Sequence, residues 1–162
     1  MLADLTKPTE INITGICKFW FAPVDWFKYF SIKHLSNIEV KYIEFLPIIN
    51  YRWLIGYHNN ENTEVETNPK QTDQGVIYES QVNLFIPGDD DSLRLLLTRM
   101  EQLRFVVMVK ETTGTVKILG DKISACRMTF KFKNKQGKKG YDVIFSCSNT
   151  NPAYIYNGII PL

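Results

Sequence analysis

Residues 126–147 read CRMTFKFKNKQGKKGYDVIFSC, and this stretch decides the fold of the chain. Apolar and polar side chains alternate in both of its arms, and the glycine- and lysine-rich residues 133–140 lie between them. A period of two is typical of antiparallel strands that bury one face, and a polar run with glycines is typical of a turn. The pattern predicts a hairpin in which apolar side chains meet across the two strands. The facing pairs are Phe132 with Tyr141, Phe130 with Val143, Met128 with Phe145, and Cys126 with Cys147.

The composition is that of a globular protein with a bias toward β structure. Of the 162 residues 44% are hydrophobic and 22% are charged, and there are ten Phe, eight Tyr and three Trp. Aromatic residues favour strands and interfaces. The net charge of +2 argues against a general nucleic-acid binder. We expect a single domain over residues 1–162.

The cysteines and the first residues indicate a reducing compartment. Cys17, Cys126 and Cys147 are too few for a disulfide scaffold and lie in apolar contexts, so we expect reduced thiols in the core. The stretch MLADLTKPTEI has neither the basic nor the apolar region of a secretion signal. No stretch approaches the ~18 uninterrupted apolar residues of a membrane span. We therefore expect a cytosol-like location and no membrane partner.

One segment has the pattern of a helix. Residues 89–92 (DDDS) supply N-cap oxygens for a helix over about residues 92–104. The acidic run could instead bind a cation, but capping explains it without a metal. Apolar side chains at helical spacing predict one stripe buried on the sheet, with Arg94, Thr98 and Glu101 exposed. The members of the stripe are Leu93, Leu96, Leu97, Met100 and Leu103.

The other segments are predicted to be strands and loops. Residues 105–109 (FVVMV) are apolar at every position, as in a central strand covered on both faces. A long strand is predicted at residues 76–86. Further strands are predicted at residues 10–21 with a bulge near Gly15, and at residues 39–45, 51–57, 115–119 and 152–156. The aromatic residues 22–30 are assigned to a loop or short edge element. Polar residues 58–74 are assigned to an extended loop or protruding hairpin. The fold class is α+β, mainly β: an antiparallel β-sandwich or rolled sheet with one packed α-helix.

Candidate catalytic groups are sparse. His34 and His58 are the only histidines and neither lies in a recognised motif. A cysteine nucleophile would have to come from Cys126 or Cys147, for which core packing is the favoured interpretation. We expect no enzymatic activity, no metal and no cofactor. The lysine-rich residues 117–139 could contact phosphate, which would bring the protein into nonspecific proximity to DNA, but a solvated strand face is favoured.

The C-terminal half carries a resemblance to a known class of proteins. Its segments are, in order, LLLTRMEQLRF, VVMVK, ETTG, TVKILGD, ACRMTFKFK, GYDVIFSC and PAYIY. This order of helix, strands and turns over residues 75–156, about half of the chain, resembles small structural proteins of the morphogenesis modules of tailed bacteriophages and prophages of Bacteroidetes-type hosts. It is also similar to the tail-tube family, whose subunits are β-sandwiches or rolled sheets flanked by a helix and assembled into rings.

The resemblance implies a non-enzymatic virion subunit of tail-tube, tail-terminator, connector or baseplate type. Its partners would be further copies of itself in a ring or other virion proteins, in the host cytoplasm during assembly and then in the virion. The alternatives are a monomeric ligand-binding or adaptor module and a small enzyme of unrecognised type. The residues expected at a subunit interface are Trp26, Phe27, Tyr29, Glu64, Glu66, Lys135, Lys138 and Lys139.

Overall fold

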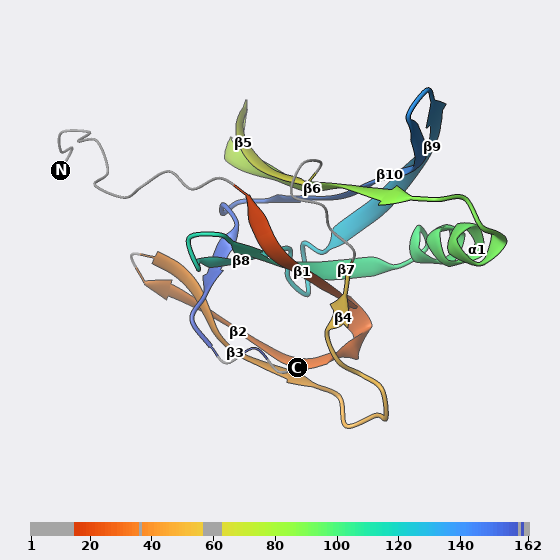
Figure 1. The fold of residues 1–162 in the computed structure, drawn as a ribbon. Coiled ribbons are helices and arrows are strands. Elements are labelled where there is room, and N and C mark those ends of the chain that lie inside the picture. The colour runs from red at the N-terminus through yellow and green to blue at the C-terminus, as the bar shows by residue number, and fades with distance from the viewer. Residues whose placement is uncertain (1–14, 36, 57–62, 159, 161–162) are drawn as a thin grey trace.

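The computed structural model describes residues 15–35, 37–56, 63–158 and 160, and it shows a mainly β protein (Figure 1). Within these residues the one α-helix is α1 (Asp91–Met100), and a 3₁₀ turn, η1 (Val24–Trp26), joins the first two strands. The strands are β1 (Ile16–Pro23), β2 (Phe27–Leu35), β3 (Asn37–Phe45), β4 (Leu54–Ile55), β5 (Glu64–Thr72), β6 (Gly75–Pro87), β7 (Arg104–Glu111), β8 (Val116–Leu119), β9 (Cys126–Lys135), β10 (Lys138–Asn149) and β11 (Tyr154–Tyr156). The predicted α+β, mainly β class is confirmed.

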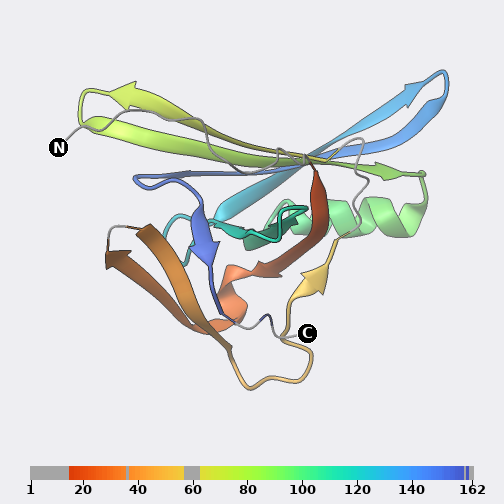
Figure 2. The ribbon, with the colours of Figure 1, turned by 60° about the vertical axis from the view of Figure 1, so that its left-hand side comes forward.

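The strands form one hydrogen-bonded sheet with the order β2-β3-β11-β8-β7-β9-β10-β6-β5, while β1 pairs with β7 and β4 pairs with β1. The sheet divides at β7, because β9 pairs with residues 104–105 of that strand and β8 pairs with residues 107–110. Figure 2 shows the two long hairpins of β5–β6 and β9–β10 on one side and the β2–β3 hairpin on the other. One pairing departs from the antiparallel expectation: β11 lies parallel to β3. Strand β11, which follows β10 in the chain, lies between β3 and β8.

Two hydrophobic cores lie on opposite faces of β7. Phe105, Val107 and Val109 belong to one core, and Val106 and Met108 belong to the other. All five side chains are at most 1% exposed. Because successive side chains of a strand point to opposite faces, a strand covered on both sides must be apolar throughout. The prediction of a central strand from FVVMV is confirmed.

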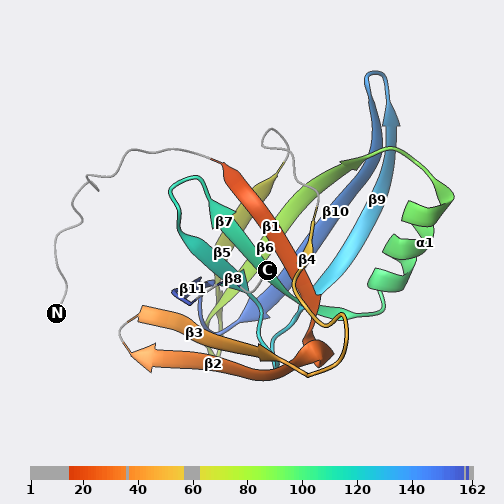
Figure 3. The same cartoon turned by 60° about the horizontal axis from the view of Figure 1, so that its bottom comes forward.

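The hairpin register predicted from residues 126–147 is confirmed over the paired residues, which extend from Arg127 opposite Ser146 to Lys135 opposite Lys138. Tyr141 lies opposite Phe132, and Phe145 lies opposite Met128. The predicted turn at residues 133–140 is too long, because both strands continue until only residues 136–137 remain between them. The tip extends beyond the body of the molecule (Figure 3), and Phe132 is 42% exposed there, since the hairpin is longer than the core that it covers.

Helix α1 begins as predicted but is shorter and less buried. The Asp90 carboxylate accepts hydrogen bonds from the backbone N–H groups of Ser92 and Leu93, at 2.7 and 3.0 Å. Leu97 and Met100 are buried, whereas Leu96 is 54% and Leu103 43% exposed, so the predicted stripe is wrong at these two positions. The helix packs at the margin of the sheet and is covered over a narrow face only, and Leu103 lies beyond its end. The predicted exposure of Arg94, Thr98 and Glu101 is confirmed.

Three further segments need correction. In the aromatic segment 22–30, residues 27–30 belong to strand β2 at one end of the sheet order, so the edge-element alternative holds there and the loop alternative is wrong. Within the described part of the predicted strand at 51–57, only Leu54–Ile55 is extended. The polar segment 58–74 contains strand β5, which pairs with β6 along its whole length, so from residue 64 onward the hairpin alternative holds and the loop alternative is wrong. The predicted bulge near Gly15 is confirmed by the register shift between Ile16 and Lys18.

Candidate functional site

Phe27 is the one predicted interface residue that lies in the chain's own core. Its side chain is 2% exposed and packs against Phe45 and Trp53, with ring centroids 4.8 and 5.3 Å apart. Strand β2 turns Phe27 inward immediately after η1. It therefore cannot anchor a neighbouring subunit, and we remove it from the candidate interface.

The other aromatic candidates reach the surface. Trp26 is half-buried and stacks on Tyr51, with the ring centroids 4.6 Å apart and the planes 9° from parallel. Tyr29 is 52% exposed and lies 5.7 Å from the ring of the equally exposed Tyr42 on the neighbouring strand β3. Tyr42 is not among the predicted residues, because strict alternation places it on the same face of β3 as the buried Val40, and a register shift between β2 and β3 turns it outward. Tyr29 and Tyr42 together form an exposed aromatic pair beside the open edge of the sheet.

The predicted acidic residues lie on the opposite edge strand. Glu64 is exposed at the start of β5, whereas Glu66 accepts a hydrogen bond of 2.9 Å from the Nε2 group of Gln81 on β6. Strands β2 and β5 end the sheet order, so each leaves one side without a strand neighbour in the described part of the chain. The structure therefore separates the acidic and aromatic candidates onto the two edges of one sheet.

The predicted lysines lie at the β9–β10 tip and are partly engaged within the chain. The Nζ group of Lys139 is 3.7 Å from a carboxylate oxygen of Asp89, and that of Lys138 lies 4.2 Å from the centre of the Phe85 ring. Hydrogen bonds from Tyr141 and then from Arg94 lower the pKa of Asp89, and this network ties the tip to the start of α1. Lys135 is exposed at the end of β9.

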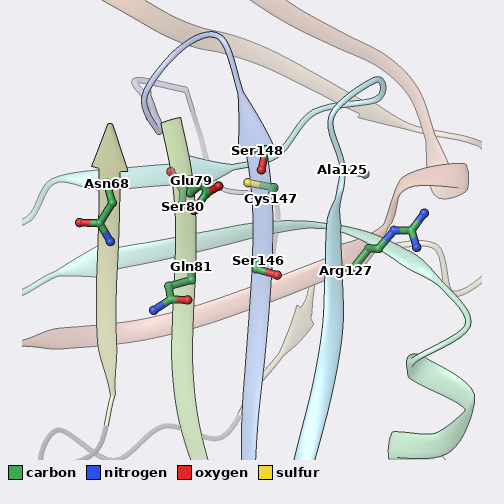
Figure 4. A pocket seen from close by; sticks show the side chains of 9 residues that line it. All are labelled: Asn68, Glu79, Ser80, Gln81, Ala125, Arg127, Ser146, Cys147 and Ser148. Carbon is green, nitrogen blue, oxygen red and sulfur yellow. The ribbon is translucent and has the colours of Figure 1, made fainter. Parts of the chain in front are cut away.

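A polar depression of about 410 Å³ crosses strands β5, β6, β10 and β9 (Figure 4). Its walls carry Glu79, Gln81, Ser146 and Arg127. Figure 4 shows the Arg127 guanidinium directed away from Glu79, and Glu79 instead pairs with Lys70 at 3.2 Å. The charged side chains therefore do not converge on one point, as they would around a reacting group.

Two free thiols lie beneath the same region of the sheet. Cys126 is buried and Cys147 is partly buried, and both are free thiols as predicted, whereas Cys17 is exposed on β1, so the predicted core position is wrong for Cys17. The Cys126 thiol donates a hydrogen bond of 3.4 Å to the carbonyl oxygen of Leu119, and its interaction with Cys147, followed by burial, raises the pKa of Cys126. The interaction with Cys126, with a smaller contribution from the backbone of Gly120, lowers the pKa of Cys147. The two cysteines thus interact across the hairpin, as the apolar alternation of the sequence predicts.

An apolar groove lies between α1 and the β1–β4 pair. It has a volume of about 600 Å³, and its walls include Trp26, Trp53, Leu96 and Leu103. Two arginines, Arg52 and Arg99, also line it. Sequence reasoning missed this groove, because its walls come from three distant segments. The only local signal is the excess of leucines on α1, more than a buried stripe needs.

Comparison of the chain with protein-family models, with curated proteins and with solved structures gives no match. Within the described residues no helix is long and apolar enough to cross a membrane. The described side chains also contain no group of three or more His, Cys, Asp or Glu residues placed to hold a metal ion.

Proposed function

We propose that this protein is a non-enzymatic structural subunit of a tailed-phage virion, of tube, terminator, connector or baseplate type, that assembles with copies of itself or with neighbouring virion proteins. The order of elements over residues 75–156 supports the phage class through its resemblance to morphogenesis proteins. The observation that carries the assembly role is the pair of nine-residue edge strands, β2 and β5, at the two ends of the sheet order.

An open edge strand presents unpaired backbone donors and acceptors to another strand. A contact of β2 in one copy with β5 in the next would join two different surfaces, and such head-to-tail contacts close into rings or extend into fibres. Tyr29 and Tyr42 flank the β2 edge and supply exposed aromatic area of the kind that anchors interfaces. Proximity of the lysine-bearing β9–β10 tip to packaged DNA remains part of this proposal.

The test is assembly of tag-free protein, followed by light scattering after size exclusion and by electron microscopy. The double variant Tyr29→Ser/Tyr42→Ser should lose assembly, because the aromatic anchor is removed from a surface that does not support the core. Ile123→Ser is the matched control, since Ile123 is 91% exposed in the turn between β8 and β9, outside both edge strands, and should assemble as wild type. Assembly of the double variant at the wild-type concentration dependence would contradict the proposed interface.

A second candidate function is a ligand-binding module, and the apolar groove favours it. Its volume of about 600 Å³ is within the range of small-molecule sites, which are mostly apolar with a few polar groups. The two functions are compatible at the β2 edge, because Tyr29 and Tyr42 do not line the groove; Trp26 alone among the interface candidates belongs to it.

A further inference from the structure

We propose that the apolar groove binds a single-chain amphipathic carboxylate of the fatty-acid class, with its carboxylate between Arg52 and Arg99 and its chain lying along α1.

The charge of the groove selects an anionic group. Arg52 and Arg99 both line the groove and both are exposed at its surface. Neither guanidinium forms an ion pair with a carboxylate of the described residues. Guanidinium groups bind carboxylates through paired hydrogen bonds, so two of them at the rim of an apolar site favour an acid over an alcohol or an amine.

The interior of the groove selects an apolar chain. A second cavity of about 140 Å³ adjoins it, sharing Phe21, Ile55, Leu96 and Met100, and reaches the core residues Leu97 and Phe145. This inner cavity is lined by apolar residues and one glycine only. Leu96 and Ile55 line both the groove and the second cavity, and they are 54% and 77% exposed. A bound chain would therefore remove a large apolar surface from water.

The same inner cavity argues against a peptide as the occupant. An extended peptide would carry backbone N–H and C=O groups into a space whose lining side chains offer them no hydrogen-bond partner, which is costly. A hydrocarbon chain has no such groups. The arrangement of charged rim and apolar interior therefore fits an acid with one alkyl chain better than a segment of a neighbouring protein.

The experiment is titration of the full chain with octanoate, decanoate and dodecanoate below their micelle concentrations, by calorimetry and by tryptophan fluorescence. Trp26 and Trp53 both line the groove, so the fluorescence should report occupancy. We expect one molecule per chain and roughly fourfold tighter binding for each added CH₂. Dodecanol and dodecylamine should bind at least about tenfold more weakly than dodecanoate, because they lack the group that the arginines recognise.

Two variants and a control locate the site. Arg52→Gln/Arg99→Gln should bind dodecanoate no better than wild type binds dodecanol, and Leu96→Glu should abolish binding at a position exposed enough to keep the fold. Arg127→Gln removes another exposed arginine, one that lines the polar depression, and should bind as wild type. Tyr29→Ser/Tyr42→Ser should also bind as wild type, so failure of this inference and failure of the assembly proposal give different results.

Four results would overturn the inference. The first is equal affinity for dodecanoate and dodecanol, and the second is an equal loss of affinity in Arg127→Gln. The third is a wild-type dimer that takes up no acid and that Leu96→Glu converts to monomers, because a second copy would then be the occupant of the groove. Absence of binding by all three acids would likewise exclude it.

Discussion

At the scale of single residues, Asp121 organises the junction of β8, β9 and β11. The buried carboxylate accepts hydrogen bonds from the backbone N–H groups of Ile123 and Ser124, each at 2.7 Å. It also accepts from the Asn149 side chain at 3.1 Å and from the Tyr154 hydroxyl at 2.8 Å. Burial opposes ionisation, but these hydrogen bonds outweigh it and lower the pKa of Asp121. Burial and then the bond to Asp121 raise the pKa of Tyr154 to about 12.

We predict that Asp121→Asn lowers the free energy of unfolding by about 2–3 kcal/mol at pH 7, since the bonds to a charged acceptor are weakened. Because the folded-state pKa of Asp121 lies below its unfolded value of about 3.9, its contribution is present above that pH and is lost as pH falls through the folded pKa. Urea denaturation of both proteins between pH 7 and pH 2 measures this. A difference that is unchanged at the lowest pH would show that the charge of Asp121 is not what stabilises the junction.

The thiol pair gives a second residue-scale prediction. Because the pKa of Cys147 is lowered and that of Cys126 is raised, iodoacetamide should modify Cys147 of the native protein before Cys126. The measurement is peptide mass spectrometry over time, in a Cys17→Ser background that removes the exposed thiol. Cys126→Ala, which removes the thiol and leaves no donor at this position, should slow the modification of Cys147. Equal rates for Cys126 and Cys147 in the folded protein would contradict the assigned interaction between the two thiols.

At the scale of elements, α1 is held by a narrow contact. Leu97 is 2% exposed within the core and Leu96 is 54% exposed. Leu97→Ala should therefore cost ~2–5 kcal/mol of unfolding free energy, because it leaves a cavity between the helix and the sheet. Leu96→Ala is the matched control one residue away and should cost under about 1 kcal/mol. Urea titrations of both variants test this, and similar midpoints for the two would mean that the buried face of α1 is wrongly assigned.

The helix also shows how far periodicity alone predicts burial. The spacing of the leucines and Met100 identifies one face of the helix, and the structure confirms Leu97 and Met100 on it. Periodicity does not report how wide a surface covers that face. Leu96 and Leu103 are left exposed because the sheet ends beside them, and these residues become walls of the groove.

At the scale of the whole molecule, the proposal of assembly includes a charge contact between β5 of one copy and the β9–β10 tip of another, separate from the β2–β5 edge contact. We predict that Glu64→Lys and Lys135→Glu each weaken self-association, because each variant places two like charges at the contact. A mixture of the two variants should restore association, because every contact between the two different variants again joins a lysine to a glutamate. Sedimentation velocity between 50 and 500 mM salt measures the effect, and the wild-type association should weaken with salt. Ile123→Lys serves as the charge control. If the mixture associates no better than either variant alone, these two residues do not meet across subunits.

The sequence by itself determined the elements whose side chains alternate strongly. The period of the apolar residues determines the β9–β10 register and the burial of β7 on both faces. The side-chain chemistry of Asp90 determines the helix cap. Both causes act within one segment or between neighbouring segments. Only the tertiary structure decided the rest. Strand β5 is polar and takes its extended form from hydrogen bonds to β6. Phe27 is buried because η1 turns β2 inward. The groove exists because α1, η1 and β4 meet at one margin of the sheet. Each of these depends on contacts between residues distant in the chain, whose free energy no local pattern records.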